Sequence, residues 1–264
     1  MVKEEHYLNL YLDKVIFKFK YSTILSLSSD NIDAAKPFRK KIFEEFPVVD
    51  IDMTQGIDLD MDLNIEDIDP LNLIDNLIWI FKNMSQDKTV ELTDSYLKIT
   101  YEDGSFTDIN MFLYEINLII DALNEFAPIY PESLELKYNH LIFDKNLDEL
   151  KEDINDKYFN NKLMKMIGEY NFSNYMSMLN FKDNSYNINI HYGLFDDFSD
   201  ILNKQQYMFN ITCAYKIISS VDEVFDVLKD MDKTMWKYYK TAIKPKFRKE
   251  MKERILEGNL PNQY

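Results

Sequence analysis

Strict alternation of apolar and polar residues is the feature that most constrains the fold of this chain. Residues 15–21 carry Val, Phe, Phe and Tyr at every second position, with Lys18 and Lys20 between them. Because a strand places successive side chains on opposite faces, this period of two predicts a strand with one buried face. Similar runs predict further strands at residues 77–84, 89–93, 96–101, 133–143, 175–181, 185–192 and 206–215.

Two longer stretches repeat their apolar residues every three to four positions, which is the period of an α-helix. In the first half, the residues that follow this period are Ile109, Phe112, Ile116, Ile119, Ile120 and Leu123. They predict a helix over about 107–127, ended by Pro128 because proline cannot continue a helix. A second long helix is predicted from Ser220 to about residue 243, and the spacing of Ser220 to Glu223 matches a capping box.

The order of these elements predicts the fold class. Three antiparallel strands followed by a long helix occur twice, and strand runs followed by helices are typical of α+β folds. We therefore expect antiparallel sheets with long helices packed on them, in two architecturally similar strand-strand-strand-helix halves. The halves are residues 1–144 and 145–264, expected to form one compact unit; the second begins with a charged connector at 146–156 and ends in a long basic helix. A shorter helix is expected at about 35–46, ended by Pro47.

Composition favours a globular protein of a reducing compartment. The 264 residues are 46% hydrophobic and include only five glycines, so no glycine-rich phosphate loop is expected. The one cysteine, Cys213, excludes an internal disulfide framework and a cysteine zinc cage, and its place on an apolar strand face predicts a buried, inert thiol. The most apolar run, residues 71–81, contains Asp75 and is shorter than the roughly 20 residues that span a bilayer. We expect a cytoplasmic protein with no cofactor, no metal and no membrane contact.

Charge is distributed unevenly along the chain. The net charge of −16 disfavours general nucleic-acid binding, because phosphates would be repelled. Residues 229–254 nevertheless contain ten Lys or Arg and four Asp or Glu, a local balance of +6. The candidate partner-binding residues of this region are Lys229, Lys233, Lys237, Lys240 and Lys244. Their spacing places them within about 80° of arc on one face of the last predicted helix.

Two interpretations of this basic face stay open. It is a contact stripe for an acidic protein or a nucleic-acid backbone, or it is a solvated helix face. The second interpretation has a physical basis, because lysines near a helix C-terminus are stabilised by the helix dipole and attracted by the acidic remainder of the chain.

An aspartate-rich run suggests calcium binding but departs from the known pattern. The run Asp58-x-Asp60-x-Asp62 resembles the start of an EF-hand loop, which needs glycine at its sixth position and glutamate at its twelfth. Those positions hold Leu63 and Asp69. The alternation of acidic and apolar residues across 50–69 instead predicts one or two edge strands with their aspartates facing outward.

No catalytic constellation is recognisable. Glu135-Leu136-Lys137 has the Glu-x-Lys spacing of metal-dependent nucleases, in which the carboxylate holds a divalent ion and the lysine stabilises charge on the attacked phosphate. The upstream aspartate of such a site is not identifiable, because Asp121 lies inside the preceding helix. The three histidines, His6, His140 and His191, have no zinc-binding spacing. No catalytic residue is therefore predicted.

The order of these features resembles a sporadically distributed, uncharacterised family of bacterial and archaeal proteins of similar length. The matching features are the Phe46-Pro47 pair, the stretch from Trp79 to Leu123, and the closing strand and aromatic-rich helix from Gln206 to Phe247. Lys137-Tyr138-Asn139-His140 stands where the family has an Arg-Tyr-x-Asn-like sequence and departs from it at the first and last positions. The resemblance implies no enzymatic activity, and the scattered distribution of the family implies a role in phage defence or in a mobile element.

The sequence therefore favours a non-enzymatic protein-interaction module, such as a subunit, inhibitor or immunity partner in a microbial defence or mobile-element system. The alternative is a nucleic-acid-directed protein, either a binder that uses the basic helix or a metal-dependent nuclease that uses Glu135 and Lys137. A homo-oligomer is compatible with both interpretations. A small-molecule sensor has only the aromatic content in its favour.

Overall fold

The computed structural model describes residues 10–27, 32–55, 75–102, 104–158, 175–196, 205–216, 218 and 220–256. The described strands are β1 (Leu12–Tyr21), β2 (Val48–Gln55), β3 (Asp75–Lys82), β4 (Lys88–Leu92), β5 (Tyr96–Glu102), β6 (Pro131–Lys145), β7 (Tyr175–Asp183), β8 (Tyr186–Asp196) and β9 (Gln205–Tyr215). The described helices are α1 (Lys36–Ile42), α2 (Ile109–Phe126), α3 (Leu147–Asp153), α5 (Val221–Ala242) and α6 (Pro245–Leu256), with a 3-10 turn at Ile32–Ala35 before α1.

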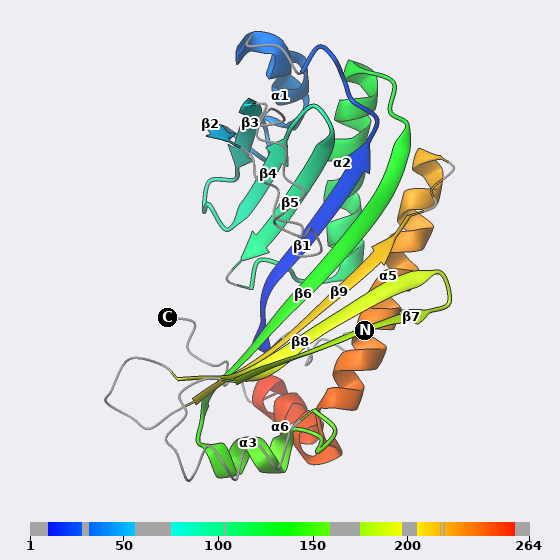
Figure 1. Cartoon of the computed structure of the whole chain (residues 1–264). Coiled ribbons are helices and arrows are strands. Elements are labelled where there is room, and N and C mark those ends of the chain that lie inside the picture. The colour runs from blue at the N-terminus through cyan, green and yellow to red at the C-terminus, as the bar shows by residue number, and fades with distance from the viewer. Residues whose placement is uncertain are drawn as a thin grey trace.

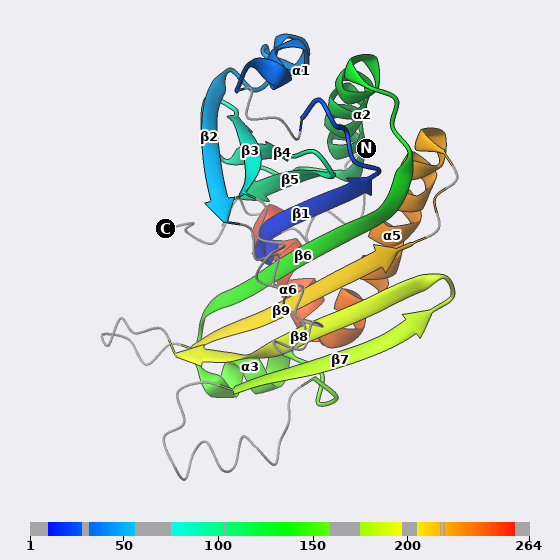
Figure 2. The same cartoon turned by 45° about the horizontal axis from the view of Figure 1, so that its top comes forward.

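The strands form one sheet in the order β2-β3-β4-β5-β1-β6-β9-β8-β7 (Figure 1). All neighbouring strands are antiparallel. Helices α1, α2 and α5 lie on the same face of this sheet, and α3 and α6 lie together near the C-terminal end of α5 (Figures 1 and 2). The α+β prediction with helices packed on an antiparallel sheet is confirmed, in the form of a single sheet. The expected boundary at 144/145 falls at the end of β6, which pairs with both β1 and β9.

Period-two alternation predicted the strands correctly. Each of the eight alternating runs overlaps one described strand. The alternating residues Val15, Phe17, Phe19 and Tyr21 of β1 are buried beneath the helices, as the pattern predicted. β2 is an edge strand with Asp50 and Asp52 exposed, which confirms that part of the aspartate-rich prediction. The calcium-like run at residues 58–62 lies outside the described residues.

The helices agree with their patterns in position, but α1 ends at Ile42, before the predicted stop at Pro47. Five of the six periodic residues of α2 are buried, and Ile109 is half-buried. Ser220 is the N-cap residue of α5, but its side chain makes no capping hydrogen bond, so the predicted capping box is wrong. Glu223 instead accepts a long hydrogen bond of 3.4 Å from the hydroxyl of Tyr215. None of the helices in the described ranges is long and apolar enough to cross a bilayer.

Cys213 lies on the buried face of β9, as predicted. Burial, together with the nearby carboxylates of Asp230 and Asp183, raises the pKa of its thiol to about 12. Because only the thiolate is a strong nucleophile, this cysteine is unreactive at neutral pH.

Close packing of β7 against β8 depends on a glycine. A Cβ atom at Gly193 would lie 1.9 Å from the carbonyl oxygen of Tyr175 and 2.9 Å from the Cα atom of Met176. Both contacts are with backbone atoms, so β7 has to move when a side chain is added. We expect Gly193→Ala to lower the free energy of unfolding by about 1–3 kcal/mol, the usual cost of overpacking. Urea unfolding should show this loss; a variant as stable as the parent would mean that β7 shifts freely.

A basic pocket at the end of helix α5

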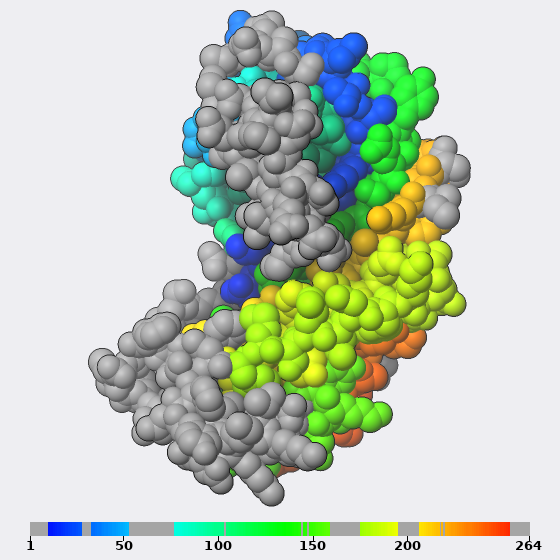
Figure 3. Space-filling model, in the orientation of Figure 1, coloured from blue at the N-terminus to red at the C-terminus, as the bar shows by residue number. Residues whose placement is uncertain are grey.

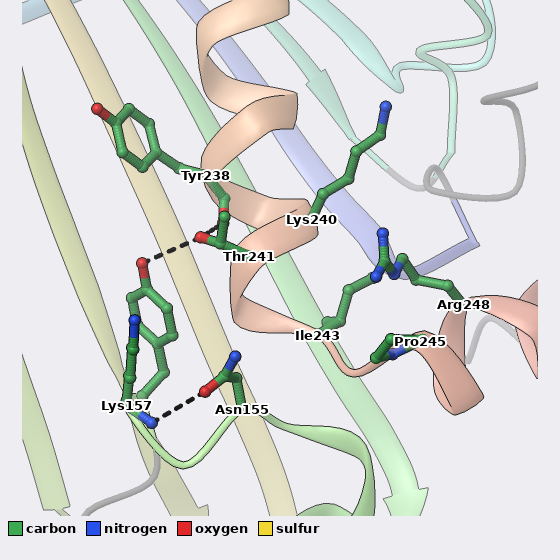
Figure 4. Close-up of a pocket in the computed structure, with 9 residues that line it drawn as sticks. Asn155, Lys157, Tyr238, Lys240, Thr241, Ile243, Pro245 and Arg248 are labelled. Carbon is green, nitrogen blue, oxygen red and sulfur yellow. Dashed lines mark hydrogen bonds between the residues drawn. The ribbon is translucent and has the colours of Figure 1, made fainter.

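A cavity with a volume of about 530 Å³ lies where α5 turns into α6. Its lining residues are Asn155, Lys157, Tyr158, Tyr238, Lys240, Thr241, Ile243, Pro245 and Arg248 (Figure 4). They come from the end of α5, the start of α6 and the segment that follows α3. The cavity therefore joins segments that lie more than eighty residues apart in the sequence.

Backbone hydrogen bonds hold these segments together. The amide of Asn155 donates to the carbonyl of Ala242 at 2.7 Å, and the amide of Lys244 donates to the carbonyl of Asp153 at 2.7 Å. Ile154 and Ile243 form an isolated antiparallel bridge between these two bonds. The chain leaves the α5 helix at Ile243 because its backbone pairs here with the segment after α3. Pro245 then occupies the first turn of α6, where a missing amide hydrogen costs nothing.

A chain of hydroxyl groups orders one wall of the pocket. The hydroxyl of Thr241 donates to the carbonyl of Tyr238 at 2.7 Å. It therefore accepts from the hydroxyl of Tyr158, which lies 3.2 Å away (Figure 4). The carbonyl of Tyr158 in turn accepts a hydrogen bond of 2.9 Å from the buried hydroxyl of Tyr207 on β9. Hydrogen bonds therefore link Tyr158 both to α5 and to the sheet.

The charged residues of the described lining are all cationic. Lys157, Lys240 and Arg248 contribute three cationic side chains, and the nine lining residues include no carboxylate. The Nε atom of Arg248 is buried and has no hydrogen-bond partner among the residues that the structure describes. An arginine places five N–H donors in a fixed fork that matches a carboxylate or phosphate. In a chain of net charge −16, a cavity whose described lining carries only cationic charge is a site suited to an anionic group.

The candidate lysines do not form one uniform face. Four of them lie on α5, but Lys244 lies beyond the helix end, which corrects the prediction that all five share a helical face. Its ammonium donates to the carbonyl of Lys151 at 2.7 Å and pairs with Asp156 at 3.2 Å. Only Lys240 lines the pocket.

The other α5 lysines differ in their contacts. Lys237 pairs with Asp183 at 2.9 Å, and the hydroxyl of Tyr238 donates to the same carboxylate at 2.7 Å. These two hydrogen bonds lower the pKa of Asp183, with Tyr238 the larger cause. Lys229 lies 3.7 Å from Asp226. Lys233 is exposed and makes no ion pair within the described part of the chain.

The residues paired with Glu135 and Lys137 on the adjacent strands supply no further carboxylate for a nuclease-like metal site. Both side chains are half-buried on the face that lies opposite α2 and α5. Glu135 lies opposite Lys18 of β1 and Ala214 of β9, and Lys137 lies opposite residues without a carboxylate. Within the described ranges, no three His, Cys, Asp or Glu side chains gather in the manner of a metal site.

His140 is part of a buried cluster between β6 and α5. Its ring stacks on Tyr239 at 3.7 Å, and its Nδ1 atom lies 3.2 Å from the carbonyl oxygen of Phe209. Beside it, the hydroxyl of Tyr138 donates to Asp232 at 2.6 Å. Burial lowers the pKa of His140 to about 3, so the imidazole is neutral at physiological pH. All these groups are enclosed, and their role is to fasten α5 to the sheet.

A second cavity, of about 130 Å³, lies at the start of α2. Its charged groups pair with one another. Buried Glu115 accepts from Lys88 at 2.5 Å and from the hydroxyl of Tyr101 at 2.6 Å. Asp108 caps α2 by accepting from the amides of Asn110 and Met111. These contacts hold α2 against β4 and β5, so this small cavity is a structural feature.

Sequence reasoning found part of the pocket. Lys240 is one of the candidate lysines, and Arg248 belongs to the basic run 229–254. Lys157 and Tyr158 were missed, because no local pattern marks a residue that reaches the site only through long-range pairing of its segment. No family model matches this chain, and no curated protein matches it at a significant level.

Proposed function

We propose that this protein is a non-enzymatic interaction module that binds an acidic segment of a partner protein in the basic pocket. The observation that carries the proposal is the lining itself, whose nine described residues include Lys157, Lys240 and Arg248 and no acidic residue. The remaining surface of a chain with net charge −16 repels an acidic partner. Electrostatic attraction therefore favours binding of such a partner at the pocket.

The polar and aromatic lining supports a peptide-like ligand. Asn155 offers an amide group, although its Oδ1 atom already accepts from the amide of Lys157 at 3.2 Å. Tyr158 and Tyr238 present aromatic surface beside the cations. Aromatic rings and arginine are enriched at protein interfaces, because they combine apolar area with polar recognition.

The resemblance to the sporadically distributed family supports a biological setting for this activity. We propose that the acidic partner is a component of a microbial defence or mobile-element system, for which the protein is a subunit, inhibitor or immunity partner. We also propose that the two halves are a repeat. Strands β3-β4-β5 precede α2, strands β7-β8-β9 precede α5, and both helices pack on the same face of the sheet.

Reversing charge inside the pocket tests the proposal. The double variant Lys240→Glu/Arg248→Glu should weaken binding of a fluorescent hexaglutamate peptide by about tenfold or more, since exposed charge pairs contribute about 0.2–1 kcal/mol each and reversal adds repulsion. Fluorescence anisotropy measures this change. Binding to the parent should also weaken between low and physiological salt, because the screening length is then only about 8 Å.

A control reverses one charge outside the pocket and is compared with the single variant Lys240→Glu, which makes the same change of charge inside it. Lys249 lies on α6 with 79% of its side chain exposed, and it does not line the cavity. Lys249→Glu should keep most of the affinity for hexaglutamate. Equal binding by the parent and the double variant would refute the assignment of the pocket. Binding of a single-stranded DNA oligonucleotide in preference to hexaglutamate would favour the nucleic-acid alternative.

A further inference from the structure

The two edges of the sheet differ in how they are protected. An open sheet leaves a row of unpaired backbone N–H and C=O groups on each edge strand. Charged side chains on an edge strand commonly prevent it from pairing with another chain. The β2 edge has such side chains, since Asp50 and Asp52 are both exposed on it. The opposite edge, β7, pairs only with β8 among the described strands.

The β7 edge is uncharged and apolar along most of its length. Its first seven residues, 175–181, contain no charged side chain. Met176 and Met178 are 50% and 57% exposed on the open face of the sheet, and Leu179 is 40% exposed on the helix face. Figure 3 shows the yellow-green atoms of β7 and β8 uncovered on the visible side of the molecule. The exposed side chains of Met176 and Met178 on one face of β7 and of Leu179 on the other form an apolar surface whose burial is favourable.

We propose that β7 pairs with β7 of a second copy of this chain, in antiparallel register about Leu179, and joins the two sheets into one. This places Met178 opposite Asn180 of the second copy and Met176 opposite Lys182. No like charges face each other in this register. A two-fold axis that lies between two copies of the same strand gives a self-complementary interface, and all neighbouring strands of this sheet are antiparallel.

The distribution of charge favours dimerisation through the β7 edge. Lys182 and Asp183 balance each other within β7, and the Asp183 carboxylate is also bound by Lys237 and Tyr238. The edge is therefore locally neutral in a chain of net charge −16. A neutral, apolar strand is the place where two such acidic chains approach with the least repulsion. The proposal is independent of the basic pocket, because neither β7 nor β8 contributes a lining residue.

Sedimentation velocity over a range of concentrations tests this dimer. We expect Met178→Lys to raise the dissociation constant of the dimer by at least about tenfold, because it places two lysines close together across the axis. Met84→Lys, at a methionine that is 78% exposed outside β7, is the matched control and should leave the dimer unchanged. Thermal unfolding of each variant checks that the fold is intact.

Salt and cross-linking make the test specific. Added sodium chloride should strengthen the dimer by screening the net negative charge, whereas it should weaken hexaglutamate binding at the pocket. Leu179→Cys should form an interchain disulfide on oxidation, because the two copies of residue 179 lie directly opposite each other across the axis. Native Cys213 is buried and should stay reduced. A parent that is monomeric at all concentrations, a Met178→Lys dimer as tight as the parent's, or a Leu179→Cys variant that does not cross-link would each overturn the proposal.

Discussion

Lowering the pH from 7 to about 3 is expected to remove roughly 4–5 kcal/mol of folding stability through His140 alone. The imidazole has a pKa of about 6.5 in the unfolded chain and about 3 in the folded protein, where burial disfavours its charged form. Between these values the unfolded chain binds a proton that the folded protein does not bind. The contribution is therefore fully present above about pH 6.5 and is lost as the pH falls toward 3.

His140→Phe isolates this effect. A phenyl ring can keep the stacking on Tyr239. It also removes the Nε2 atom, which is buried and has no hydrogen-bond partner within the described ranges. Urea unfolding at pH 7 and pH 4 should show that the parent loses about 3 kcal/mol more than the variant over this interval. The carboxylates titrate in both proteins and cancel in the comparison. Equal losses in the two proteins would mean that His140 is protonated without cost in the folded state.

Replacing Lys145 is expected to have the other large effect. Its side chain is 8% exposed, and its ammonium lies 2.5 Å from Asp153, 3.2 Å from Glu250 and 4.4 Å from the ring centre of Phe247. Burial is the main cause that raises the pKa of Asp153, and the lysine opposes that rise. Lys145→Met leaves the Asp153 carboxylate buried without its cation, which typically costs about 3–5 kcal/mol. For a protein of this size we expect a fall in Tm of roughly 10 °C.

A second substitution distinguishes charge from packing. Lys145→Met/Asp153→Leu removes both charges and should recover most of the lost stability, since apolar pairs often replace buried ion pairs at little cost. These residues also fix α3 and α6, which carry the pocket segments. Hexaglutamate binding should therefore weaken in the single variant and return in the double variant. A single variant with an unchanged Tm would show that Lys145 does not stabilise the fold.

The secondary structure could be predicted from the sequence because its signals are local. The period of two in β1 and the apolar repeat of α2 each lie within one element, and neither depends on which other element is adjacent. The burial of Cys213 followed from its strand face in the same way. By contrast, the strand order required long-range information, since β1 pairs with β5 and β6 rather than with the next strand in the chain.

The position of the candidate site also depends on contacts between segments far apart in the sequence, so only the tertiary structure could locate it. The sequence determined that the C-terminal helix is amphipathic and basic, because charge and period are properties of the chain itself. It did not determine that the helix ends at Ala242, because the end is set by backbone pairing of Ile243 with Ile154, far away in the sequence. That pairing removes Lys244 from the helix and brings Lys157 and Tyr158 beside Lys240. The sequence thus determined which residues are basic. Only the tertiary structure decided which of them share a cavity, because a cavity forms between segments whose contacts no local sequence pattern encodes.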